Sequence, residues 1–118
     1  MSARLKTEIW VAAMIRRYEA QGVPVMVIAK GDVDGGAVLV KHNRFAAGCR
    51  LYAQVRTPEG AAAWMAVAGG DKAGDDARAQ EMACDDYIRR ERDIDPDVWA
   101  IEVEDARGVF TPDGAVVS

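Results

Sequence analysis

An alternating segment at residues 49–56 constrains the fold more than any other feature of this chain. Every second position is apolar and the positions between are polar or aromatic, and the apolar set is Cys49, Leu51, Ala53 and Val55. Successive side chains of a β-strand point to opposite faces, so the segment predicts a strand with one buried and one solvated face. Such a strand belongs to a sheet on which helices pack.

Two amphipathic segments predict these helices. The first begins at Thr7, which we expect to be the N-cap, and ends near Gly22 because Pro24 blocks continuation. The second is capped by Asp75 or Asp76 and runs to about Asp93. Its expected inner stripe is Ala77, Gln80, Cys84, Tyr87 and Ile88.

Four further segments have the composition of strands. Val25–Lys30 is a continuous apolar run that predicts a well-buried strand. The glycine- and aspartate-rich residues 31–36 predict a turn, and Ala37–His42 the returning strand of a hairpin. Ala62–Val67 and Val98–Glu104 are the remaining strand predictions.

These elements predict an α+β protein with the order α-β-β-β-β-α-β. We expect a mostly antiparallel sheet of about five strands with two helices packed on it. The 118 residues, half of them hydrophobic, suffice for one domain with one core. That domain spans residues 1–118, with a core at about 4–108 and a short hairpin or loose tail at about 109–118.

The sequence also indicates the cellular compartment in which we expect the protein. No apolar run reaches the roughly 18 to 20 residues of a membrane-spanning helix, and the N-terminus lacks the pattern of a secretory signal, so we expect a cytoplasmic protein. Cys49 and Cys84 share no C-x-x-C spacing, and we expect both to be small buried hydrophobes. With one histidine in the chain, no zinc site can be assembled.

The chain resembles a bacterial family, the domain of unknown function 1491. The resemblance runs from about Arg4 to Gly108 and rests on motifs in the family's order, namely Arg4-Leu5-Lys6-Thr7, Trp10-Val11, Arg16-Arg17, Lys30-Gly31-Asp32, Gly36-Ala37-Val38, Trp64, Asp95-Pro96-Asp97-Val98-Trp99 and Glu102-Val103-Glu104-Asp105. Members of that family are short single-domain proteins from alphaproteobacteria. The resemblance implies no activity, cofactor or catalytic residue.

Charge is distributed unevenly along this acidic chain, whose net charge is −4. Residues 1–56 hold 9 Lys and Arg against 4 Asp and Glu, and residues 57–118 hold 6 against 15. The two halves either neutralise each other across the domain or form a basic face and an acidic face. The second arrangement would suit head-to-tail association or a basic protein partner.

The tetrapeptide Lys41-His42-Asn43-Arg44 is the strongest candidate for a binding site. It places the single histidine and two cations where a strand ends. Arg44 offers bidentate contacts to a phosphate or carboxylate, Lys41 offers a point charge, and His42 titrates near neutral pH. The alternative is a solvated strand end with an asparagine turn.

A carboxylate cluster near the second helix end is the candidate metal site. Magnesium prefers oxygen ligands, and the candidate ligands are Asp95, Asp97, Glu102 and Glu104. The alternative is a solvent-exposed strand face whose charges prevent the edge of the sheet from pairing with another strand. The loop that begins at Asp32 does not match an EF-hand calcium loop. Such a loop needs Gly at its sixth position and Glu at its twelfth, and this chain has Ala37 and Asn43 there.

These features favour a non-enzymatic binding or protein-interaction module acting through a homo-oligomer or a protein partner. The expected interaction surface comprises Arg50, Tyr52, Arg56 and Trp64. No nucleophile motif or cofactor loop occurs, so no cofactor is expected. The alternative function is a small enzyme or ligand-binding domain for an anionic metabolite at Lys41, His42 and Arg44. Nucleic-acid binding is disfavoured by the overall acidity.

Overall fold

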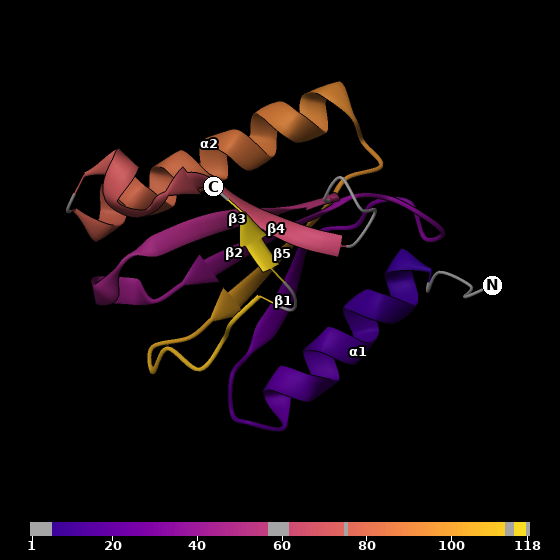
Figure 1. The fold of residues 1–118 in the computed structure, drawn as a ribbon, viewed down its shortest axis with the longest axis horizontal. Coiled ribbons are helices and arrows are strands. Elements are labelled where there is room, and N and C mark those ends of the chain that lie inside the picture. Colours follow the sequence, from indigo (N-terminus) through magenta and orange to yellow (C-terminus); the bar gives the residue numbers. More distant parts are fainter. Residues whose placement is uncertain (1–5, 57–61, 75, 113–114, 118) are drawn as a thin grey trace.

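The computed structural model describes residues 6–56, 62–74, 76–112 and 115–117. In this part of the chain a six-stranded sheet separates two helices, with α2 on one face and α1 on the other (Figure 1). The helices and strands are α1 (Thr7–Glu19), β1 (Val25–Ala29), β2 (Val38–Asn43), β3 (Cys49–Arg56), β4 (Ala62–Gly69), α2 (Ala77–Ile94), β5 (Trp99–Glu104) and β6 (Ala115–Val117). Two short 3₁₀ turns, η1 (Phe45–Ala47) and η2 (Gly70–Ala73), flank β3 and β4.

The predicted α+β class with a mostly antiparallel sheet is confirmed. The strand order is β1-β5-β2-β3-β4-β6. Pairs β1–β5, β2–β3 and β3–β4 are antiparallel, whereas β2–β5 and β4–β6 are parallel. The short strand β6 extends the sheet beyond the five strands that we expected.

The predicted hairpin of the second and third elements is wrong, because β5 lies between β1 and β2. The loop that joins β1 to β2 crosses the start of β5, where Asp32 N donates to Asp97 O and Trp99 N donates to Ala37 O. Ala100, Ile101 and Val103 of β5 have no exposed surface. Their burial explains why β5 takes a central place that a local turn pattern could not indicate.

Strand β1 is an edge strand, which corrects the prediction that it is well buried. Val25 is buried, but Met26, Val27 and Ile28 are 47%, 42% and 45% exposed. Helix α2 contacts mainly β3 and β4, away from this edge, whereas α1 contacts β1. Three successive residues of β1 are nevertheless exposed, so both faces of the strand meet solvent there. The continuous apolar run at residues 25–29 therefore forms a partly exposed edge strand and not a buried central strand.

The core has two parts, one on each face of the sheet. On the α1 face, Val11, Met14 and Tyr18 of α1 pack on the sheet with Trp64 and Trp99. On the α2 face, the predicted stripe of α2 is buried at Gln80, Cys84 and Ile88. Cys49 and Cys84 are free and buried in this second part, as predicted.

The segment after β5 belongs to the fold and is no loose tail. Phe110 is 6% exposed, and its ring lies against Tyr18, His42 and Tyr52. Tyr18 Oη also donates to the carbonyl of Thr111. An aromatic residue beyond the expected end of the core thus joins α1 to the sheet.

The helix ends follow the local signals closely. Asp76 caps α2 by accepting from Arg78 N, as predicted. Thr7 is the first residue of α1, and its hydroxyl donates to Gly36 O instead of capping the helix. Of the helices in the described ranges, none combines the length and the apolar character that crossing a membrane requires.

Candidate functional site

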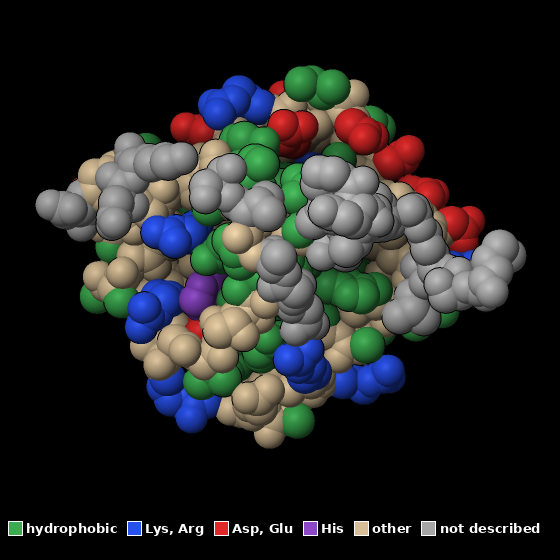
Figure 2. Space-filling model, in the orientation of Figure 1, with side chains coloured by type: hydrophobic (Ala, Val, Ile, Leu, Met, Phe, Trp, Pro, Cys, Tyr) green, Lys and Arg blue, Asp and Glu red, His purple; other side chains and the backbone are tan. Residues whose placement is uncertain are grey.

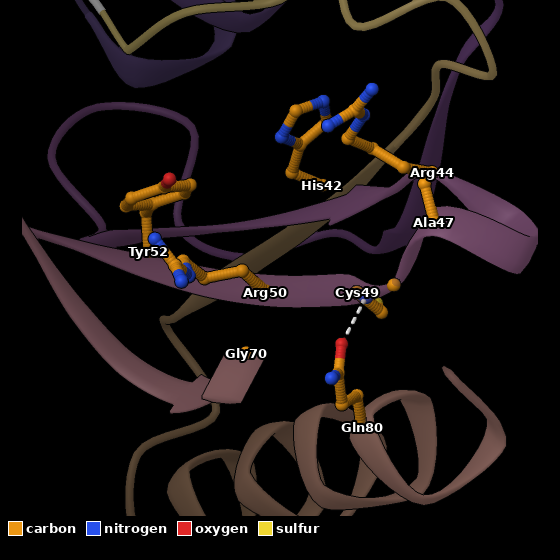
Figure 3. Close-up of a pocket in the computed structure, with 9 residues that line it drawn as sticks. His42, Arg44, Ala47, Cys49, Arg50, Tyr52, Gly70 and Gln80 are labelled. Carbon is orange, nitrogen blue, oxygen red and sulfur yellow. Dashed lines mark hydrogen bonds between the residues drawn. The ribbon is translucent and has the colours of Figure 1, made fainter. Parts of the chain in front are cut away.

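A polar pocket of about 250 Å³ opens at the end of the sheet where β2 passes into β3 (Figure 3). Side chains from both strands and from α2 surround it. Its lining residues are His42, Arg44, Ala47, Gly48, Cys49, Arg50, Tyr52, Gly70 and Gln80. Two of these, His42 and Arg44, come from the predicted anion-binding cluster.

A tight loop between β2 and β3 brings these side chains together. Arg44 N donates to Gly48 O, and Phe45 N donates to Asn43 Oδ1, which closes the loop over η1. The two strands then pair in antiparallel register, with His42 directly opposite Arg50. Opposed residues share a face of the sheet, so both side chains project toward the same pocket.

A buried carboxylate holds the imidazole of His42 in place. His42 Nε2 lies 2.8 Å from Asp105 Oδ2, and the Asp105 side chain has no exposed surface. Asp105 also accepts backbone hydrogen bonds from Val109 and Phe110. Burial alone would raise the pKa of Asp105, but these backbone donors and His42 hold it below its ordinary value. Asp105 is therefore a carboxylate at neutral pH.

Two guanidinium groups line the pocket beside the histidine. Arg44 lies over Gly108 and Arg50 over Gly70, and a Cβ at either glycine would come within 2.8 Å of the arginine nitrogens. Both glycines have positive φ, so any other residue would be strained there as well as crowding the arginine. Among the described residues, neither guanidinium has an ion-pair or hydrogen-bond partner.

The pocket is electropositive. Burial lowers the pKa of His42, and the charges of Arg44 and Arg50 act in the same direction, outweighing Asp105. His42 is thus neutral at pH 7, and the two arginines carry the pocket's charge. Figure 2 shows blue side chains beside the single histidine, while acidic side chains gather along the top of the molecule near α2.

The remaining wall is held by hydrogen bonds and ring packing within the protein. Gln80 in the first turn of α2 accepts from Cys49 N at 3.0 Å and donates to Gly74 O at 2.6 Å. Tyr52 is 9% exposed and packs with Phe110 on the other side of the pocket. The contacts of Gln80 and of Tyr52 therefore hold this wall in place without a ligand.

Lys41, the third predicted anion ligand, lies on the opposite face of the sheet. Its Nζ contacts Glu81, Asp85 and Glu102 at 2.7, 2.8 and 3.6 Å. Burial alone would lower its pKa, but hydrogen bonds to Asp85 and Glu81 and the charge of Glu102 raise it. Neighbouring strand residues point to opposite faces, which separates Lys41 from His42.

The predicted metal ligands do not converge. Glu102 contacts Lys41 and accepts from Asn43 Nδ2, whereas Asp95 accepts from Asp97 N in the turn before β5. Glu104 lines a separate hollow beside Pro24. In the described ranges of the chain, no three His, Cys, Asp or Glu side chains lie close enough to hold a metal ion.

The predicted interaction residues also separate. Arg50 and Tyr52 line the pocket, and Trp64 is 3% exposed and stacks with Trp10 at 5.8 Å between ring centroids. An anchor role for Trp64 would need exposure that this packing does not give. Arg56 ends β3, and its side chain lies outside the described residues.

Sequence reasoning did not assign Arg50, Asp105 or Gln80 to the anion site. Arg50 could have been found from the short loop, since antiparallel pairing across residues 44–48 places it opposite His42. Asp105 and Gln80 are 63 and 31 residues distant from the groups that they bind, and no local pattern marks such contacts.

The comparisons with known proteins agree on the family. The family model described as a protein of unknown function, DUF1491, matches residues 5–110. The chain belongs to the DUF1491 family. None of the curated proteins matches it.

Two solved structures of a DUF1491 family protein from Caulobacter crescentus are similar to this chain. The crystal structure is 36% identical, covers 97% of this chain and 100% of the other, and has a TM-score of 0.81. The NMR structure is 37% identical, covers 99% and 100%, and has a TM-score of 0.78. A solution structure from A. tumefaciens is 25% identical, covers 86% of both chains and has a TM-score of 0.66.

Proposed function

We propose that this DUF1491 protein is a non-enzymatic binding module for a small anion that bears a phosphate or carboxylate group. The observation that carries the proposal is the pair of guanidinium groups, Arg44 and Arg50, which face one pocket without an acidic partner among the described residues. Arginine binds phosphate and carboxylate in bidentate fashion, and an unpaired pair of arginines favours an anionic occupant.

The size of the pocket limits the ligand. Its volume of about 250 Å³ is below the roughly 300–1,000 Å³ of pockets that enclose drug-sized ligands. The walls at Gln80 and Tyr52 are fixed by their own contacts, so the pocket does not widen easily. A single phosphate or carboxylate group with a small attached part fits these dimensions.

Calorimetric titration of small phosphates and carboxylates against the wild-type protein and single variants tests the proposal. We expect R44A and R50A each to weaken binding about tenfold or more, because each removes a charge-assisted contact worth about 1.5–3 kcal/mol. R90A is the matched control, since Arg90 is an exposed arginine on α2 outside the pocket. Equal losses in all three variants, or no binding by the wild type, would contradict the proposal.

Self-association through β1 is a second candidate function that one observation favours. Residues 25–29 carry no charge and no proline, and three of them are exposed on an edge strand. Uncharged, exposed edges pair readily with other strands. We infer a second copy of this chain as the partner, because two identical uncharged edges are complementary in antiparallel pairing about a two-fold axis.

Sedimentation equilibrium tests this candidate. V27K places a charge in the middle of the edge and should convert a dimer to a monomer without loss of secondary structure. I9K adds the same charge to an exposed apolar position of α1 and should leave the dimer intact. A wild-type protein that is monomeric at all concentrations would rule the candidate out.

A further inference from the structure

The hydrogen-bond arrangement around His42 specifies which ring nitrogen is available to a ligand. A buried carboxylate accepts hydrogen bonds and donates none, so the Asp105 contact fixes the proton of neutral His42 on Nε2. No other hydrogen bond to this side chain is formed within the described part of the chain. Because His42 lines the pocket and Asp105 does not, the unprotonated Nδ1 is left for the ligand.

The pocket therefore presents two kinds of group at once. The guanidinium groups of Arg44 and Arg50 are donors only, and Nδ1 of neutral His42 is an acceptor only. The Asp105 carboxylate is held by two backbone N–H groups as well, so it cannot turn to offer a different contact. An occupant that satisfies the whole set has anionic oxygens and, beside them, a hydroxyl hydrogen.

We propose that the pocket selects hydrogen phosphate, the protonated form of a phosphate group, over anions of the same shape that lack a hydroxyl. Its anionic oxygens accept from Arg44 and Arg50, and its O–H donates to His42 Nδ1. This inference rests on the anion-binding function proposed above and names the ligand class. Sulfate has the same tetrahedral shape but no proton at neutral pH, so it would place an oxygen lone pair against Nδ1.

Discrimination of this kind is physically strong when the acceptor is held rigidly. A site built around a ligand hydroxyl rejects analogues without it, because one of its own polar groups is then left unpaired. The side chain of His42 is 11% exposed, so water only partly replaces the missing donor. We expect inorganic phosphate to bind about tenfold or more tightly than sulfate at pH 7.5.

The preference has a defined pH dependence. The charged and titratable groups that face His42 are Asp105 after β5, Arg44 after β2, and Arg50 and Tyr52 on β3. As pH falls, protonation of Nδ1 turns the acceptor into a donor, which sulfate can satisfy. Since burial and the arginines lower the pKa of His42, the preference for phosphate persists through neutral pH and is lost in more acidic solution.

Calorimetry with inorganic phosphate and with sulfate, at pH 7.5 and about pH 5, tests the inference on the wild-type protein. H42F removes the acceptor but keeps both arginines, and it should bind the two anions with equal affinity. Because the chain has one histidine, its ¹⁵N resonances report the tautomer without assignment of other rings. We expect the proton on Nε2 at neutral pH.

The outcomes separate the two proposals. Tighter binding of phosphate at pH 7.5 with a smaller difference at pH 5 supports the inference. Equal binding of phosphate and sulfate at pH 7.5, or a proton on Nδ1, overturns the selectivity and leaves the anion site standing. Absence of binding by both anions overturns the anion site and the selectivity together.

Discussion

At the scale of single residues, the lysine ion pairs of this protein differ mainly in their exposure to water. Lys41 has a 4% exposed side chain and contacts three carboxylates, whereas Lys30 and Glu8 form a pair at 3.1 Å with both side chains more than half exposed. Water screens the second pair, so its contribution to stability is small. Removing Lys41 would leave the three carboxylates that contact it without their cation.

We therefore expect K41M to lower the free energy of unfolding by about 2–3 kcal/mol. Breaking a fully buried pair costs about 3–5 kcal/mol, and Glu81 and Asp85 are 41% and 53% exposed, which reduces that cost. Urea unfolding at neutral pH measures the change. K30M is the control, with an expected loss of at most about 1 kcal/mol. A loss in K41M no larger than in K30M would show that the carboxylates are solvated without the lysine.

Asp105 predicts a dependence of stability on acid. Its pKa is lower in the folded protein than its ordinary value of 3.8, so its contribution is complete above that value. The contribution is lost as pH falls through the folded pKa. D105N should therefore be less stable than the wild type at pH 7, and the difference should shrink at about pH 3. A difference that is constant between these two pH values would contradict a role for the charge.

At the scale of elements, a buried polar side chain joins the first turn of α2 to the sheet. Gln80 is 7% exposed and contacts both Cys49 of β3 and the loop at Gly74. Its oxygen accepts a buried hydrogen bond from the backbone N–H of Cys49, the first residue of β3. This contact explains why a polar residue occupies the inner stripe of α2.

We expect Q80A to lower the free energy of unfolding by about 1–3 kcal/mol, since it removes the buried hydrogen bond that Cys49 N–H donates to Gln80. The same substitution at the exposed Gln54 of β3 should change stability by less than about 0.5 kcal/mol. Thermal unfolding of both variants provides the comparison. Hydrogen exchange at Cys49 N adds a local measurement, and slow exchange in Q80A would contradict the assignment.

At the scale of the whole molecule, the segment after β5 closes α1 onto the sheet. Phe110 contacts the rings of Tyr18 from α1, His42 from β2 and Tyr52 from β3. The same segment supplies the backbone donors that hold Asp105. The core and the pocket therefore depend on one stretch of chain.

We predict that F110A lowers the free energy of unfolding by about 3–5 kcal/mol, the usual cost of deleting a buried aromatic ring. F45A removes the same ring from a position that is 48% exposed and should cost much less. Chemical denaturation measures both. If F110A unfolds like F45A, the segment does not close the core in the way that its contacts indicate.

Local pattern predicted much of this fold. The alternation of residues 49–56 corresponds to β3, and the apolar spacing after Thr7 and after Asp76 corresponds to α1 and α2. These properties depend on neighbours in the sequence, since side-chain period and capping are local. The fate of the two cysteines was also predictable, because small apolar residues on an inner stripe are buried.

Only the tertiary structure decided the strand order and the site. The insertion of β5 between β1 and β2, the separation of Lys41 from His42, and the contact of His42 with Asp105 join residues far apart in the chain. Each depends on which buried surfaces pair across the whole molecule, and composition alone does not specify that pairing. The sequence by itself determined which segments form the two helices and the first five strands, because these patterns are local. Long-range packing determined the place of β6 and which side chains meet in the pocket.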